Sequence, residues 1–97
     1  MQNSLNGQVV WITGGGSGIG LAGATALVKA GAHVIISGRN KETNASALTA
    51  LQALGSAEAV LLDVADSAAV KAVADDIVSR HKRIDILVNS AGINTPR

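Results

Sequence analysis

The feature that most constrains the fold is a glycine-rich loop placed between a strand pattern and a helix pattern. Residues 9–13 form a short apolar run, and five of the seven residues 14–20 are glycine. Glycine is costly to order, so this run indicates a sharp turn or a close approach to the backbone. The helical pattern that follows covers about residues 17–30, and the N-terminus of a helix favours a phosphate. The loop predicts a phosphate site, with a tight turn that binds nothing as the alternative.

The rest of the chain alternates between the same two patterns. Short apolar runs bounded by turn residues recur at residues 34–37, 59–62 and 84–88. A second helix is expected over about 41–54, and a third after Asp66, a suitable N-cap. Gly31 and Gly55 are expected to end the first two helices. This order predicts right-handed βαβ units around a buried parallel sheet: an α/β, Rossmann-type, doubly wound fold with four strands in the order 3-2-1-4 and three helices.

Composition excludes several classes of function. The chain has 97 residues, a net charge of +1 and no cysteine. We therefore expect one domain without nucleic acid partners, disulfides or thiolate metal sites. No apolar run is long enough to span a bilayer, and no signal peptide is evident, so a cytoplasmic protein without membrane contact is expected. Trp11 is expected in the core. His33 and His81 lack metal ligands at suitable spacing, and both are expected to be solvated, with no metal site.

The residues after the loop distinguish between kinds of phosphate site. A Walker A loop needs Lys and then Ser or Thr after its last glycine, whereas Leu21 and Ala22 follow Gly20. The absence of these residues excludes a P-loop NTPase. A literal GxGxxG begins at Gly18 and ends at Gly23, but it starts too far beyond the strand, and we interpret it as coincidental.

Three motifs in order carry a resemblance to a known family. The spacing TGGGSGIG, residues 13–20, resembles the TGxxxGIG signature of short-chain dehydrogenases/reductases. Asp63-Val64, which we expect to close the third strand, resembles the pair with which this family contacts adenine. Residues 89–92, Asn-Ser-Ala-Gly, are similar to its NNAG motif, with Ser90 in place of the second Asn. The resemblance covers nearly the whole chain.

The resemblance implies a dinucleotide site with these cofactor-binding residues: Gly14, Ser17, Gly18, Ile19, Gly20, Arg39, Asp63, Val64, Asn89, Ala91 and Gly92. Ser17 and the N–H groups after it would face the pyrophosphate. Asp63 would accept the adenine amino group while Val64 supplies its N–H, and residues 91–92 would lie beneath the ribose. In the family, Asn89 ties neighbouring strands together. A strand-end cap remains the alternative for Asp63, and a turn-forming residue for Asn89.

The end of the second strand indicates which dinucleotide is bound. NAD sites of this fold hold an acidic residue there for the ribose 2′-hydroxyl. Here Gly38 takes that place and Arg39 follows, so a 2′-phosphate is not repelled, and the guanidinium can pair with it. The same absence disfavours a methyltransferase or a flavin domain. We predict NADP rather than NAD, with a solvated loop charge as the alternative for Arg39.

The catalytic part of the family pattern has no counterpart in this sequence. The family uses a Ser and a Tyr-x-x-x-Lys motif beyond the NNAG turn, and this chain has no Tyr. We therefore expect residues 1–97 to be the NADP-binding half-domain of an oxidoreductase that reduces a carbonyl or oxidises a secondary alcohol. A 3-oxoacyl thioester, a steroid, a sugar and a polyol remain open as substrates. Family members are usually homo-oligomers, through contacts outside this segment. The alternatives are a non-catalytic dinucleotide-binding module and a half-domain whose fourth strand pairs with another chain.

Overall fold

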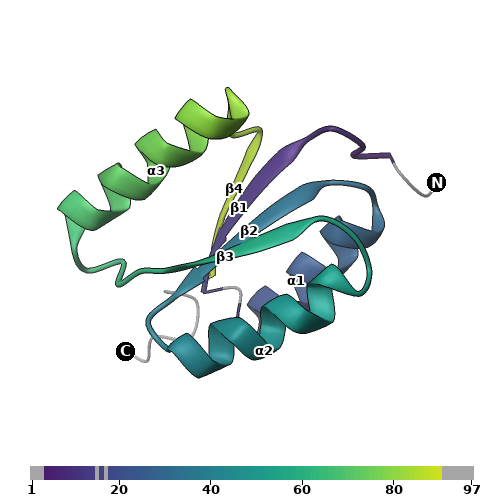
Figure 1. Ribbon diagram of the computed structural model, residues 1–97, viewed down its shortest axis with the longest axis horizontal. Helices are drawn as coiled ribbons and strands as arrows, with labels where there is room; N and C mark the ends of the chain where they lie inside the picture. Colours follow the sequence, from purple (N-terminus) through teal and green to yellow (C-terminus); the bar gives the residue numbers. More distant parts are fainter. Residues whose placement is uncertain (1–3, 15, 17, 91–97) are drawn as a thin grey trace.

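A computed structural model describes residues 4–14, 16 and 18–90 (Figure 1). The strands of the described residues are β1 (Val9–Thr13), β2 (His33–Gly38), β3 (Ala57–Leu61) and β4 (Ile86–Asn89). The helices that alternate with them are α1 (Gly18–Lys29), α2 (Lys41–Gln52) and α3 (Ser67–His81). This alternation confirms the element order expected from the sequence.

The four strands form one parallel sheet in the order β3-β2-β1-β4, as predicted. Trp11 of β1 lies between Ile35 of β2 and Leu87 of β4. Because all the strands run in the same direction, their carboxyl ends meet at one edge of the sheet. In an open parallel sheet that edge is where ligands bind.

Helices cover both faces of the sheet, which confirms the doubly wound arrangement (Figure 1). On one face α1 and α2 bury a core of small aliphatic side chains that includes Val10, Ile12 and Leu51. On the other face α3 packs Ile77 against Trp11. Trp11 is 3% exposed, and its indole N–H donates to Ser37 Oγ at 3.0 Å, so its place in the core is confirmed. Within the part of the chain that the structure describes, no helix has the length and apolar character needed to cross a membrane.

The ends of the helices follow the expected signals in part. Asp66 caps α3 by accepting the N–H of Ala69, and Gly31 has a φ of +100° just beyond α1, as expected. The second helix is shorter than predicted: it ends at Gln52. Gly55 lies beyond this end. A Cβ on Gly55 would lie 2.8 Å from Val28 Cγ1, so close packing against α1 explains the glycine at this position.

Two strand boundaries also differ from the prediction. β3 begins at Ala57 rather than at residue 59, and β4 begins at Ile86 rather than at residue 84. In β3 the pairing of Glu58 with Ile35 places a charged residue inside the sheet register. Glu58 interrupts the apolar run of β3, and the predicted strand therefore began two residues after the observed one.

Candidate functional site

An open groove of about 470 Å³ lies at the carboxyl edge of the sheet, and two of the predicted cofactor residues, Gly14 and Arg39, line it. The groove lies between the glycine loop, the end of β2 and the start of α2. The described residues that line it are Gly14, Gly16, Gly38, Arg39, Asn40, Thr43 and Asn44. Its volume falls in the range typical of small-molecule sites.

Positive φ angles and steric crowding explain the glycines at positions 14, 18 and 20. Gly14 and Gly18 adopt φ values of +78° and +59°, which side chains disfavour. The N–H of Gly14 donates to the carbonyl of Ser37 at 2.6 Å, so the loop turns across the end of β2. A Cβ on Gly20 would lie 2.2 Å from the carbonyl oxygen of Gly14. The loop is therefore folded so tightly against α1 that only bare backbone fits.

Two further residues of the loop, Ser17 and Ile19, belong to the predicted cofactor-binding set. Ile19 is 63% exposed in the first turn of α1. Ser17 lies outside the described residues.

The end of β2 offers a positive charge with open space on two sides. Arg39 is exposed, and it lines both the main groove and a second hollow of about 270 Å³. No described lining residue of the main groove is acidic. The groove therefore favours an anion beside the guanidinium.

Asn40 and Asn44 shape this groove, and the sequence analysis missed them. Asn40 caps α2, because its Oδ1 accepts the N–H of Thr43 at 2.8 Å. Asn44 is 6% exposed, and its Nδ2 donates to the carbonyls of Gly38 and Val60 at 3.1 and 3.3 Å. It thereby fixes the ends of β2 and β3. Asn40 carried a detectable signal as an N-cap ahead of a helix, whereas Asn44 carried none.

Asp63 and Val64 follow β3, which ends at Leu61, one residue before the predicted end of the strand. The Oδ1 of Asp63 accepts the N–H of Ala65 at 2.9 Å, which is the turn-capping role held open as the alternative. Asp63 also lines the second hollow beside Arg39. Val64 is 45% exposed and lines a third hollow, of about 190 Å³, with Trp11 and Asn89. Both residues therefore border open space on the carboxyl side of the sheet.

Asn89 and Ser90 tie the end of β4 to the end of β1. The hydroxyl of Thr13 donates to Asn89 Oδ1 at 2.9 Å. The Ser90 hydroxyl donates to the Thr13 carbonyl at 2.6 Å, and the Ser90 N–H donates to the same carbonyl at 3.0 Å. A Cβ on Gly20 would lie 2.7 Å from Ser90 Oγ. Serine therefore fits a crowded position under the glycine loop. The predicted residues Ala91 and Gly92 lie outside the described residues.

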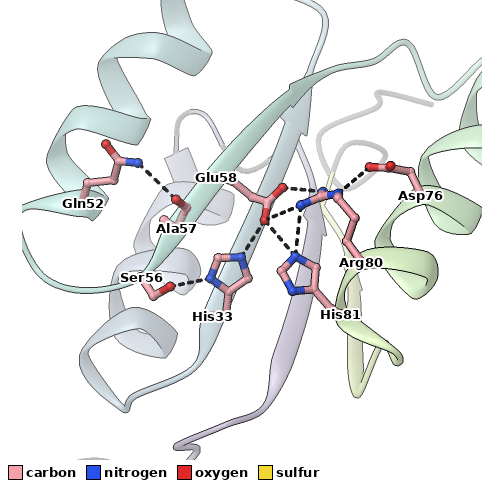
Figure 2. Close-up of polar contacts among 8 residues, drawn as sticks. All are labelled: His33, Gln52, Ser56, Ala57, Glu58, Asp76, Arg80 and His81. Carbon is pink, nitrogen blue, oxygen red and sulfur yellow. Dashed lines mark hydrogen bonds and ion pairs between the residues drawn. The ribbon is translucent and has the colours of Figure 1, made fainter.

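His33 and His81 meet at the opposite, amino edge of the sheet, and the expectation that both are solvated is wrong (Figure 2). Their side chains are 24% and 23% exposed, and their Nε2 atoms lie 2.6 and 2.9 Å from Glu58 Oε2. Arg80 also pairs with Glu58, at 2.6 Å. Burial alone would raise the pKa of Glu58, but hydrogen bonds from Arg80, His33 and His81 outweigh it and lower the pKa to about 2.

Comparison with known proteins identifies the family. The model of the short chain dehydrogenase family matches residues 8–97. The D-threitol dehydrogenase of Mycolicibacterium smegmatis is 44% identical over 91 residues, which are 92% of this chain and 35% of that protein. The rhamnolipid-biosynthesis 3-oxoacyl-[acyl-carrier-protein] reductase of Pseudomonas aeruginosa is 39% identical over 89 residues, again 92% and 35%. The chain thus spans about a third of the length of these relatives.

Solved structures show the same fold. The citronellol catabolism dehydrogenase of Pseudomonas aeruginosa matches with a TM-score of 0.88 at 33% identity, over 92% of this chain and 38% of that one. The RhlG/NADP complex of Pseudomonas aeruginosa matches with a TM-score of 0.82 at 38% identity, over 90% and 35%. An NAD⁺-bound xylitol dehydrogenase matches with a TM-score of 0.83 at 30% identity, over 87% and 33%. The chain belongs to the short-chain dehydrogenase family, whose oxidoreductases bind a nicotinamide dinucleotide.

Proposed function

We propose that this chain forms the NADP-binding part of an oxidoreductase that interconverts a carbonyl and a secondary alcohol. The observation that carries the proposal is the groove at the carboxyl edge of the sheet. There a cradle of bare backbone lies beside an exposed guanidinium, and no described lining residue is acidic. The glycine loop fits a pyrophosphate, because glycine has no side chain to keep a ligand away from the backbone at the start of α1.

The end of β2 supports NADP in particular. Overall likeness does not select the cofactor, since an NADP-bound and an NAD⁺-bound relative match about equally well. The local chemistry does discriminate. A carboxylate at the place of Gly38 would accept the ribose 2′-hydroxyl of NAD, and it would repel a 2′-phosphate. Arg39 instead offers a forked set of donors to a 2′-phosphate.

In this proposal each group of residues has a separate task. The backbone N–H groups of Gly18 and Ile19 bind the pyrophosphate with Ser17, and Asp63 and Val64 bind the adenine. Asn89 holds the ends of β1 and β4 together beneath the cofactor ribose, which Ala91 and Gly92 contact. When bound, the nicotinamide supplies or accepts the hydride of the reaction.

The relatives support the reaction class without fixing the substrate. One is named a 3-oxoacyl reductase and another a D-threitol dehydrogenase. Both names fit the exchange of a carbonyl with a hydroxyl by hydride transfer. For the oxidoreductase of which this chain forms part we propose that reaction, with a 3-oxoacyl compound as the first substrate to assay.

The proposal is tested by measuring NADPH and NADH dissociation constants from the quenching of Trp11 fluorescence. The unmodified protein is expected to bind NADPH more tightly than NADH. Arg39→Met is expected to weaken NADPH binding by about 10- to 100-fold, because a hydrogen bond to a charged group contributes roughly 1.5–3 kcal/mol. NADH binding should stay within about twofold, because NADH lacks the 2′-phosphate.

Lys29→Met is the matched control. It removes the same charge from the last turn of α1, at the amino edge of the sheet. It should leave both dissociation constants unchanged. Equal loss of NADPH affinity in both variants would show that Arg39 acts through overall charge and not through a contact with the 2′-phosphate. Tighter binding of NADH than of NADPH by the unmodified protein would refute the NADP assignment.

A further inference from the structure

We propose that His33, Glu58 and His81 form a binding site for a divalent transition metal, with Zn²⁺ as the ion of choice, at the amino edge of the sheet. The three ligand atoms come from the start of β2, from β3 and from the last turn of α3. They lie within 4.8 Å of one another (Figure 2). The site lies at the other edge of the sheet from the proposed cofactor groove and does not depend on it.

The donor set matches the chemistry of zinc. Two imidazole nitrogens and one carboxylate oxygen are common zinc ligands, and three protein ligands leave a further position open. Tetrahedral zinc with bonds of about 2.1 Å holds its ligand atoms about 3.4 Å apart. The distances from Glu58 Oε2 to the two Nε2 atoms are 2.6 and 2.9 Å. Binding the ion therefore needs side-chain rotations that open these two distances by roughly 0.5–0.8 Å and bring all three ligand atoms, which lie within 4.8 Å of one another, to about 3.4 Å.

The contact between His81 and Glu58 is the one that a metal ion would replace. An ionised carboxylate only accepts hydrogen bonds, so His81 donates from Nε2 to bond with Glu58 Oε2 at 2.9 Å. The same Nε2 lies 3.3 Å from Arg80 Nη1, which only donates, so this second contact is not a hydrogen bond while Nε2 carries its proton. A metal ion would take the place of the shared proton, because it accepts a lone pair from Nε2 and from Oε2.

Outer contacts hold two of the ligands in place, as metal sites require. His33 Nδ1 contacts Ser56 Oγ, so the hydroxyl can fix the tautomer that leaves Nε2 free for a metal. Arg80 Nη2 donates to Glu58 Oε1 at 2.6 Å and thereby turns Oε2 toward the histidines. Both histidine side chains are about three-quarters buried, which limits their freedom before any ion arrives.

Arg80 also opposes the ion, because its Nη1 lies 3.3 Å from Glu58 Oε2. A guanidinium so close to a dication is unfavourable unless it moves away. Arg80 has an alternative partner, since its Nε donates to Asp76 at 2.9 Å on the solvent side of α3. Because the guanidinium is a rigid plane, we expect it to tilt as a whole toward Asp76 when the metal binds, which lengthens the contact of Nη1 with Oε2.

The experiment is a calorimetric titration of ZnCl₂ into tag-free, chelator-treated protein that carries this sequence. The sequence has two histidines and no cysteine, so competing strong ligands are few. The expected result is a saturable isotherm with one ion per chain. His33→Gln and His81→Gln should each weaken binding at least tenfold. Glutamine can still donate to Glu58, so the fold is expected to survive; circular dichroism checks this.

Asp75→Asn serves as the matched control, because it removes an exposed carboxylate from α3 that pairs with Lys71. It should leave the isotherm unchanged. A second readout is the melting temperature, which Zn²⁺ should raise in the unmodified protein and in Asp75→Asn but not in His81→Gln. Absence of saturable binding, or equal affinity in the histidine variants, would overturn the proposal.

Discussion

Two glycines of α1, Gly20 and Gly23, differ in the space that a side chain would find at their positions. Gly20 is buried, and a Cβ there would lie 2.2 Å from the carbonyl oxygen of Gly14 and 2.7 Å from Ser90 Oγ. Gly23 faces open space, because a Cβ there would meet nothing within 4 Å. The contact of Gly20 with Gly14 is with backbone, which cannot rotate away. Gly20 therefore belongs to the packing of the loop, and Gly23 is an ordinary helical position.

We predict that Gly20→Ala destabilises the protein by about 2–4 kcal/mol, the range expected for overpacking with backbone strain. Gly23→Ala should stabilise it by about 0.5–1 kcal/mol, because alanine is the better helix former. Urea unfolding monitored by circular dichroism measures both. Equal effects of the two substitutions would contradict the close approach of α1 to Gly14.

An ion pair between Arg80 and Glu58 holds the C-terminus of α3 against β3. Arg80 reaches across to Glu58, while Lys82, with a φ of +76°, ends the helix in a left-handed conformation. Glu58 has a pKa of about 2 against an ordinary value of 4.5. Between these values the unfolded chain binds more protons than the folded one. The stabilisation from Glu58 is therefore complete above about pH 4.5 and is lost as the pH falls toward 2.

We predict that Glu58→Gln lowers stability at neutral pH by about 1 kcal/mol, a value reduced for solvent screening at this partly exposed network. The variant should also lose less stability than the unmodified protein between pH 4.5 and 2. Urea midpoints over this range, with a chelator present, provide the measurement. Asp75→Asn, from an exposed pair, should change the neutral stability by less than about 0.5 kcal/mol. Parallel pH profiles for Glu58→Gln and the unmodified protein would contradict the proposed role of Glu58.

The elements themselves could be predicted from the sequence, because their signals are local. The apolar run of β1, the cap at Asp66 and the terminator Gly31 each act within a few residues. The contacts that organise the site are not local. Asn44 bonds the carbonyl of Val60, sixteen residues away, and Glu58 is separated from His33 by twenty-five residues. Sheet pairing and the return of α3 create these contacts, and no spacing in the sequence indicates them.

In the whole molecule, the order of the sheet places β3 at one edge and β4 at the other. In the described part of the chain β4 pairs only with β1. Leu87 of β4 is 59% exposed beside that edge. An open edge strand with an apolar side chain is a site for pairing with further polypeptide. This surface favours contact with more of the same protein or with another chain.

We predict that the 97-residue chain self-associates through this edge and that Leu87→Lys reduces the associated fraction. Size-exclusion chromatography with light scattering over a range of concentrations measures it. Leu54→Lys is the matched control, because Leu54 is 46% exposed just beyond α2 and lies off the sheet edge. A chain that stays monomeric at all concentrations, or an equal effect of the two substitutions, would contradict this prediction.

We propose that the groove beside Arg39 binds the 2′-phosphate of NADP. The most direct test follows the backbone amide resonances of the isotopically labelled chain while 2′,5′-ADP and 5′-AMP are added in parallel. These ligands differ in the 2′-phosphate alone. We expect 2′,5′-ADP to bind more tightly, with the largest shifts at Gly14, Gly38, Arg39 and Asn40 and none near Glu58. Equal affinity for the two ligands, or shifts centred away from the groove, would contradict the claim.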